Sequence, residues 1–179
     1  MKTSHIMIMG IGNLLFRDEG FGIRVLENIQ ECYEFPQNVS LADGGVLGLN
    51  LMGLMSEADH LIVIDAIRNR GMAGDLYRIE GDAIPERVRA KNSLHQIDFL
   101  EALTMCQTLD KVPETVILGT EPEDIETLGI ELTPVIQGKI EPMTDMVLAE
   151  LDRLGVSYQK KTVREKLPGL LMANSEQHQ

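Results

Sequence analysis

The sequence predicts an α/β fold: a three-layer sandwich with a five-stranded, mostly parallel sheet, one antiparallel strand and helices on both faces. Two observations indicate this fold. Short aliphatic runs without polar alternation, which are typical of strands buried on both faces, recur along the 179 residues. Between them lie segments with apolar residues at helical spacing, and this alternation favours parallel strands joined by helices.

The first half of the chain follows the order strand, helix, strand, helix, strand. Residues 6–9 form the first apolar run, which ends at the loop from Gly10 to Asn13. The elements predicted after it are a helix that begins near Asp18 and stops before Pro36, a strand over residues 39–42, a helix over 49–55 and a strand over 60–65. The last of these is the clearest buried strand in the chain.

The second half supplies the antiparallel strand. The loop between Asp65 and the next strand, at residues 75–80, is shorter than the dozen or so residues of a parallel crossover, so this strand is predicted to be antiparallel. A helix over 94–105, a strand over 115–119 and a helix over 132–154 with a break near Pro142 follow. Residues 1–156 are expected to form one catalytic domain, and residues 157–179 a loosely held polar tail.

The formal net charge of -12 limits the classes of partner. Lys and Arg side chains that neutralise phosphates dominate nucleic-acid binding, so nucleic acid and anionic membranes are poor partners. No apolar run reaches the ~20 residues that span a bilayer, and no leader-like segment opens the chain, so a cytoplasmic protein is expected. Cys32 and Cys106 lie far apart in apolar helical stretches and are expected to be buried, reduced thiols.

Two carboxylates are predicted to meet at the carboxyl edge of the sheet. In open α/β sheets the ligand crevice lies beyond this edge, where the strand order reverses, here between the first and third strands. Glu19 follows the first strand and its loop, and Asp65 ends the third strand after four consecutive aliphatic residues. Burial of an uncompensated charge is unfavourable, so Asp65 needs a partner.

His95 is the third candidate for this site. Ser93 and Gln96 match a capping box, which places His95 in the first turn of a helix. The positive end of the helix dipole favours neutral imidazole there, and neutral imidazole is the form that binds metals. One imidazole and two carboxylates suit zinc or nickel, and three protein ligands leave a position open for water or a substrate group.

Each of these residues also has a simpler interpretation. Glu19 is compatible with an acid at a helix start, Asp65 with a cap on the following turn, and His95 with a surface histidine. A dinucleotide site is disfavoured, because Leu15 stands where the third glycine of a Gly-x-Gly-x-x-Gly loop belongs. His60 lies at the start of a strand and is interpreted as structural, and His5 and His178 lie in termini that offer no convergent ligands. The expected convergence of Glu19, Asp65 and His95 at the carboxyl edge of the sheet is what favours a functional site.

Five short motifs resemble those of the hydrogenase maturation endopeptidases. They are Gly10-Ile11-Gly12-Asn13-Leu14-Leu15, Asp18-Glu19-Gly20-Phe21-Gly22, Asp43-Gly44-Gly45, Ile64-Asp65-Ala66 and His95-Gln96. The resemblance spans about residues 5–155, and its first two motifs are the most specific. It implies that Glu19, Asp65 and His95 form the metal site and that Asp43 supports it.

The resemblance further implies a nickel-dependent endopeptidase whose nickel is supplied by the substrate rather than permanently bound. The substrate would be the precursor of a [NiFe]-hydrogenase large subunit, which loses a short C-terminal extension after nickel insertion by a cut after a basic residue near the last cysteine pair. The nickel would polarise the scissile carbonyl or lower the pKa of a bound water, with Asp43 or Glu19 as a candidate base. The basic loops 68–74 and 87–91 are the expected sites of partner choice. Two alternatives stay open: a zinc-dependent amidohydrolase on the same fold, and a non-catalytic chaperone that binds nickel or the precursor.

Overall fold

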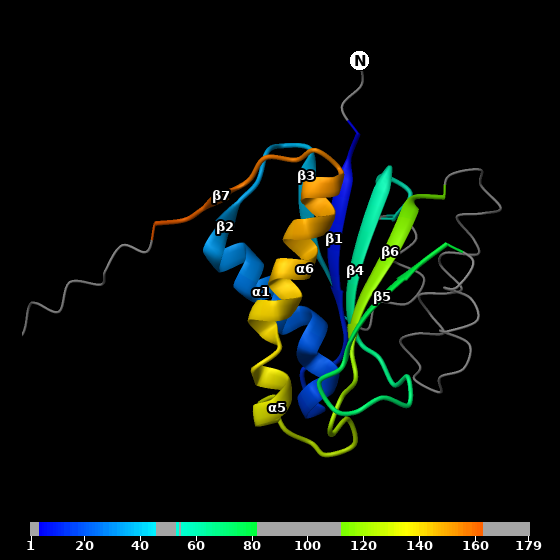
Figure 1. The fold of residues 1–179 in the computed structure, drawn as a ribbon, viewed down its shortest axis with the longest axis vertical. Coiled ribbons are helices and arrows are strands. Elements are labelled where there is room, and N and C mark those ends of the chain that lie inside the picture. Colours follow the sequence, from blue (N-terminus) through cyan, green and yellow to red (C-terminus); the bar gives the residue numbers. More distant parts are fainter. Residues whose placement is uncertain (1–3, 46–52, 54, 82–111, 163–179) are drawn as a thin grey trace, which may run out of the picture.

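The computed structural model describes residues 4–45, 53, 55–81 and 112–162, which form a five-stranded sheet and a helical layer (Figure 1). The strand order is β3–β1–β4–β6–β5. Four strands are parallel: β1 (Ile6–Ile11), β3 (Val39–Gly45), β4 (His60–Ala66) and β6 (Glu114–Thr120). β5 (Leu76–Glu80) pairs antiparallel with β6. The predicted sheet, with its one antiparallel strand, is confirmed.

Helices α1 (Phe21–Cys32) and α6 (Ile140–Arg153) cover one face of this sheet (Figure 1). α1 follows a 3-10 turn, η1 (Arg17–Gly20), and α6 follows the short α5 (Pro134–Gln137). α1 lies against β1 and β4 and also contacts α6. The apolar side chains between this layer and the sheet form the larger core cluster, in which Phe21 and Leu151 are fully buried.

The opposite face of the sheet is also apolar and buried. Alternate strand residues point to opposite faces, so Ile6 and Ile8 of β1 belong to the first cluster whereas Met7 and Met9 belong to a second one. Met55 is fully buried in this second cluster. Burial on both faces explains why the strands lack polar alternation.

The last predicted helix is interrupted in its first half, as expected. α5 ends at Gln137 and α6 begins at Ile140, so the break lies at Gly138 and Lys139. Pro142 is the third residue of α6, where no backbone N–H is needed for the helical hydrogen bonds. The predicted break in the first half of this helix is therefore confirmed, and it lies just before Pro142 rather than at it.

Part of the predicted tail pairs with the end of α1. The two-residue strands β2 (Tyr33–Glu34) and β7 (Gln159–Lys160) are antiparallel, and the Lys161 N–H donates to the Cys32 carbonyl oxygen at 2.8 Å. The ring of Tyr158 packs edge-on against Tyr33, with centroids 5.9 Å apart. For residues 163–179 the expectation of a loose tail stays a prediction.

Some predicted features lie outside the described residues. They are the helix over 94–105 with His95 and its capping box, the basic loop 87–91, Cys106, and most of the helix over 49–55, of which Gly53 and Met55 are described and helical. Cys32 is a free thiol and is half-buried rather than fully buried. Within the described ranges, no helix combines the length and apolar character needed to span a bilayer.

Candidate active site

The strand order reverses between β1 and β4. The chain passes from β1 through α1 to β3 on one side, and β4 then returns to the other side of β1. The crevice of an open α/β sheet lies at such a reversal, beyond the carboxyl ends of the strands. Glu19 lies in η1, which follows β1 and contacts β4, and Asp65 is the penultimate residue of β4. Both predicted carboxylates thus belong to segments at this reversal.

Asp65 is held in a rigid part of the sheet. It lies opposite Gly119 of β6, and its residue exposure is 7%. The Ile67 N–H donates to the Thr120 carbonyl oxygen at 2.7 Å, so the pairing of the two strands continues past Asp65. The backbone that carries this carboxylate is fixed on both sides.

Glu19 is half-buried and is fixed by the close approach of η1 to the loop after β1. The Asn13 N–H donates to the Glu19 carbonyl oxygen at 3.1 Å. Gly12 has φ +141°, and a Cβ there would lie 1.9 Å from the same oxygen. A side chain at position 12 would displace the backbone of Glu19, so Gly12 is needed for the close packing of the loop after β1 against η1.

Asp43 lies at the same edge of the sheet. It pairs with Gly10 of β1, its side chain is exposed, and its Oδ1 accepts a hydrogen bond from the Gly45 N–H at 2.8 Å. A carboxylate with one oxygen in a local turn keeps acceptor capacity on the other. This geometry is compatible with the supporting role expected for Asp43.

Glu121 holds the loop that follows β4 through hydrogen bonds. It follows β6 and is 7% exposed, and its Oε2 accepts hydrogen bonds from the Asn69 N–H at 2.6 Å, the Gly71 N–H at 3.1 Å and the Tyr77 hydroxyl at 2.7 Å. Burial, together with the hydrogen bond and negative charge of Glu121, raises the pKa of Tyr77 to about 12. Tyr77 therefore stays protonated and keeps donating to Glu121 throughout the physiological range.

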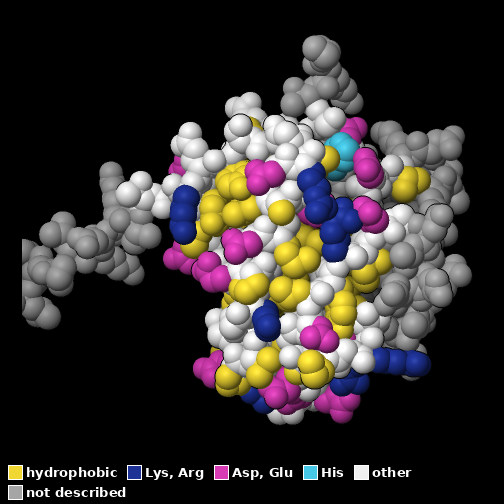
Figure 2. All heavy atoms as spheres, viewed as in Figure 1, with side chains coloured by type: hydrophobic (Ala, Val, Ile, Leu, Met, Phe, Trp, Pro, Cys, Tyr) yellow, Lys and Arg dark blue, Asp and Glu magenta, His cyan; other side chains and the backbone are white. Residues whose placement is uncertain are grey.

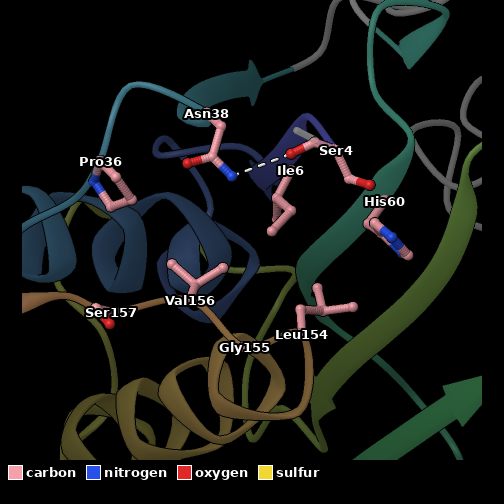
Figure 3. Close-up of a pocket in the computed structure, with 9 residues that line it drawn as sticks. All are labelled: Ser4, Ile6, Pro36, Asn38, His60, Leu154, Gly155, Val156 and Ser157. Atoms are coloured by element: carbon pink, nitrogen blue, oxygen red, sulfur yellow. Dashed lines mark hydrogen bonds between the residues drawn. The ribbon is translucent and has the colours of Figure 1, made fainter. Parts of the chain in front are cut away.

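The two described histidines lie at the opposite, amino edge. His5 contacts the Glu57 carbonyl oxygen and the Ser40 hydroxyl, and His60 Nδ1 lies 3.2 Å from Glu114 Oε2. A groove of about 370 Å³ opens here, lined by the first residues of β1 and β4 and the segment after α6 (Figure 3). This groove is remote from the strand reversal, and each of the two histidines already contacts neighbouring protein groups there.

The described residues hold only two of the three predicted metal ligands. Among them, no three His, Cys, Asp or Glu side chains gather in a way that could hold a metal ion. His95 belongs to the segment that is not described, so its position relative to Glu19 and Asp65 stays a prediction. Oxygen and nitrogen donors of this kind fit a borderline divalent ion such as nickel or zinc.

Residues 23–150 match the family model described as hydrogenase maturation protease. The chain belongs to this family. The resemblance seen in its motifs is thereby confirmed, and so is the prediction that it is an enzyme, since members of the family are endopeptidases and thus hydrolases.

The sequences of known relatives align with most of the length of the protease. It is 37% identical over 179 residues to the hydrogenase expression/formation protein HupD of Bradyrhizobium diazoefficiens, covering 99% of this chain and 93% of the relative. It is 35% identical over 153 residues to the hydrogenase 2 maturation protease of Escherichia coli K12, covering 84% of this chain and 93% of the relative. These matches extend over nearly the full length of both relatives.

The fold of the protease matches solved structures. The hydrogenase maturating endopeptidase HybD from E. coli superposes with a TM-score of 0.84 at 33% identity, covering 88% of this chain and 98% of that chain. The [NiFe] hydrogenase maturation protease HybD from Thermococcus kodakarensis superposes with a TM-score of 0.69 at 21% identity, covering 82% and 98%, and supports the fold alone.

Sequence reasoning missed one residue that positions the site of the protease. From the sequence, Asp18 is identified as a helix start and a motif residue and is given no role, but its carboxylate is fully buried and accepts hydrogen bonds from three backbone N–H groups and one hydroxyl. Its partners, Glu123, Asp124 and Thr133, lie more than a hundred residues away, so no local spacing indicates them. The adjacent position in the motif, directly before Glu19, was the available signal.

Proposed function

We propose that this protease removes a C-terminal extension from the precursor of a [NiFe]-hydrogenase large subunit after nickel insertion, with Glu19, Asp65 and His95 as ligands of the substrate's nickel. The main support is that Glu19 and Asp65 belong to segments at the strand reversal between β1 and β4. The names of two relatives, a hydrogenase 2 maturation protease and a [NiFe] hydrogenase maturation protease, support the substrate class.

The surroundings of the two carboxylates fit a site that receives a metal. Asp65 is mostly buried and fixed by the β4–β6 pairing, and Glu19 is fixed by the close contact of η1 with Gly12. Ligands held in place before binding lose little conformational freedom when a metal arrives. Two carboxylates and one imidazole also leave coordination positions that groups of the precursor would occupy.

The residues of the chain would bind and orient the precursor. Glu19 and Asp65 would hold the nickel-bearing segment at the crevice, and the exposed carboxylate of Asp43 is the candidate to accept a proton from the attacking water. Bound nickel would supply Lewis acidity near the scissile carbonyl. Because the precursor brings the metal, cleavage would report that nickel insertion is complete.

The free thiol of Cys32 favours the cytoplasm as the place where the protease acts. Cys32 is a free thiol, as is usual in a reducing compartment. The net charge of -12 disfavours anionic membranes and nucleic acid as partners, which leaves a protein precursor as the fitting substrate class.

The proposal is tested by processing of purified precursor, with and without nickel, followed by mass spectrometry of its C-terminus. The wild-type protease should shorten the nickel-loaded precursor only, and Asp65→Asn should be at least ~100-fold slower because a metal ligand is lost. Asp145→Asn is the matched control, since Asp145 is exposed on α6, and it should process normally. Normal cleavage by Asp65→Asn, or equal cleavage of nickel-free precursor, would contradict the proposal.

A further inference from the structure

Large apolar side chains are exposed mainly at the carboxyl edge of the sheet. In the described part of the chain, six such side chains are exposed, and five of them lie in segments at this edge: Leu15, Met72, Leu128, Ile130 and Val135, with Val112 as the sixth. Scattered exposed apolar residues are ordinary on protein surfaces. Their concentration beside the candidate active site indicates a surface for binding.

Three of these residues are brought together by a β-bridge between distant loops. Phe16 and Gly129 form a parallel bridge, in which the Gly129 N–H donates to the Leu15 carbonyl oxygen at 2.9 Å. The Arg17 N–H donates to the Gly129 carbonyl oxygen at 2.7 Å. Leu15, Leu128 and Ile130 flank this bridge and are 60%, 73% and 63% exposed. We refer to these three residues as the apolar ridge.

The backbone around the apolar ridge is held in place by hydrogen bonds from Arg24 and to Asp124. The Arg24 guanidinium donates to the Ile130 carbonyl oxygen at 3.1 Å. The Asp124 Oδ1 accepts hydrogen bonds from the N–H groups of Glu126 and Thr127. The hydrogen bond from the Thr127 side chain, together with those from these two N–H groups, lowers the pKa of Asp124 to about 2. A fixed apolar surface loses little conformational entropy when a partner covers it.

The apolar ridge is joined to the candidate active site by a shared segment and by the hydrogen bonds of Asp18. Leu15 and Glu19 lie on the same short segment, which Asp18 ties to the loop after β6 through Glu123 and Asp124. A polypeptide bound on the ridge would therefore lie next to η1 and the strand reversal. This position suits the part of a substrate that flanks a cleavage site.

The charge around the apolar ridge is acidic. Residues 121–131 contain five acidic residues and no basic one. Asp124 pairs with Arg17 and Glu126 with Arg68, while Glu123 and Glu131 are exposed beside the ridge. Figure 2 shows acidic and hydrophobic side chains together at the lower end of the molecule, where α5 lies in Figure 1, with basic side chains among them. A partner that combines apolar and basic side chains fits this surface.

We propose that the apolar ridge docks the large-subunit precursor through an apolar segment flanked by basic residues. This inference rests on the proposed function for the identity of the partner. It assigns binding to Leu15, Leu128 and Ile130, separately from the carboxylates that would hold nickel.

The test is the Kd for nickel-loaded precursor, measured in the Asp65→Asn background so that cleavage does not consume the complex. Leu128→Ser combined with Ile130→Ser is expected to raise the Kd about tenfold or more, because two large apolar side chains are no longer buried on binding. Glu123→Lys combined with Glu131→Lys should weaken binding as well, and most strongly at low salt.

Val112→Ser provides the matched control. Val112 is 48% exposed and precedes β6, at the amino edge of the sheet, so its replacement should leave the Kd unchanged. Unchanged affinity of the Leu128 and Ile130 double variant would overturn the inference. So would a protease that dimerises through the ridge, with the double variant monomeric in sedimentation and unaltered in precursor binding. Ridge-dependent binding together with nickel-independent cleavage by the wild-type protease would support the docking surface and contradict the proposed nickel dependence.

Discussion

The carboxylate of Asp18 accepts two hydrogen bonds from Thr133, one from its backbone N–H at 2.7 Å and one from its hydroxyl at 3.0 Å. Thr133 lies 115 residues further along the chain and directly precedes α5. The N–H groups of Glu123 and Asp124 donate to the same carboxylate at 3.0 and 2.8 Å. Asp18 thus joins η1, which carries Glu19, to the loop after β6.

Replacement of Asp18 by Ala is expected to lower the free energy of unfolding by about 2–4 kcal/mol. The physical reason is that four donors lose a buried acceptor and are left unsatisfied. Thr133→Val is the control, because it removes one of the four donors and should cost about 1 kcal/mol. Urea denaturation measures both values, and a loss below that of Thr133→Val would show that Asp18 is not the main connection.

Gly22 is expected to tolerate no side chain. A Cβ at this position would lie 2.1 Å from the Ile64 carbonyl oxygen and 2.4 Å from that of Ile11, and both are backbone atoms of the neighbouring strands β4 and β1. Gly22→Ala should therefore lower the free energy of unfolding by about 2 kcal/mol or more and slow processing, because Ile64 directly precedes Asp65. Gly53→Ala is the helical control with open space around it, and it should be neutral or stabilising by up to about 1 kcal/mol. Thermal unfolding that ranks the two variants alike would contradict this view of the motif.

The sheet was predictable because its signals are local. An apolar run such as residues 60–65 defines a buried strand by its own composition, and the short loop after Asp65 excludes a parallel crossover to β5. The break near Pro142 was predictable only in its approximate position, since proline is compatible with the first turn of a helix as well as with a break. The two-residue strands β2 and β7 carry too few residues for any periodic pattern.

The candidate site was predictable only where topology determines it. Glu19 follows β1 and Asp65 lies at the end of β4, and because the order of these strands could be inferred, their common edge could be inferred too. The partners of Asp18 and the bridge between Phe16 and Gly129 depend on contacts between segments more than a hundred residues apart. Such contacts leave no spacing signal in one sequence, which is why the anchoring of Glu19 and the apolar ridge emerged from the structure.

The contribution of Glu150 to stability is expected to depend on pH. Arg78 of β5 donates to both oxygens of Glu150 of α6, at 2.6 and 3.1 Å, and this contact lowers the pKa of Glu150 below its usual value. The stabilisation is complete above the unfolded-state pKa of about 4.3 and is lost as the pH falls through the lower folded-state pKa. Glu150→Gln should therefore destabilise by about 1–3 kcal/mol at pH 7 and by much less near pH 3.

Glu80→Gln is the control for the Glu150 prediction. Glu80 contacts the same arginine at 2.7 Å, but its side chain is 64% exposed, so its replacement should cost less than about 1 kcal/mol. Urea denaturation at pH 7, 5 and 3 gives the difference between each variant and the wild type. A Glu150→Gln difference that does not shrink between pH 5 and pH 3 would contradict the ionic origin of the contact.

The protease purified without chelators is expected to hold no stoichiometric metal, and EDTA should leave its Tm unchanged. If the substrate supplies the nickel, the folded protease is complete without it, whereas a resident metal adds its binding free energy to stability. Metal analysis by mass spectrometry and thermal unfolding with and without EDTA measure both quantities. One zinc per chain, with a Tm that falls on chelation, would instead support the zinc-dependent amidohydrolase. If the substrate supplies the nickel, the chelator-treated and dialysed protease should cleave nickel-loaded precursor at the rate of the untreated protease, because every ligand that the protease contributes is already in place.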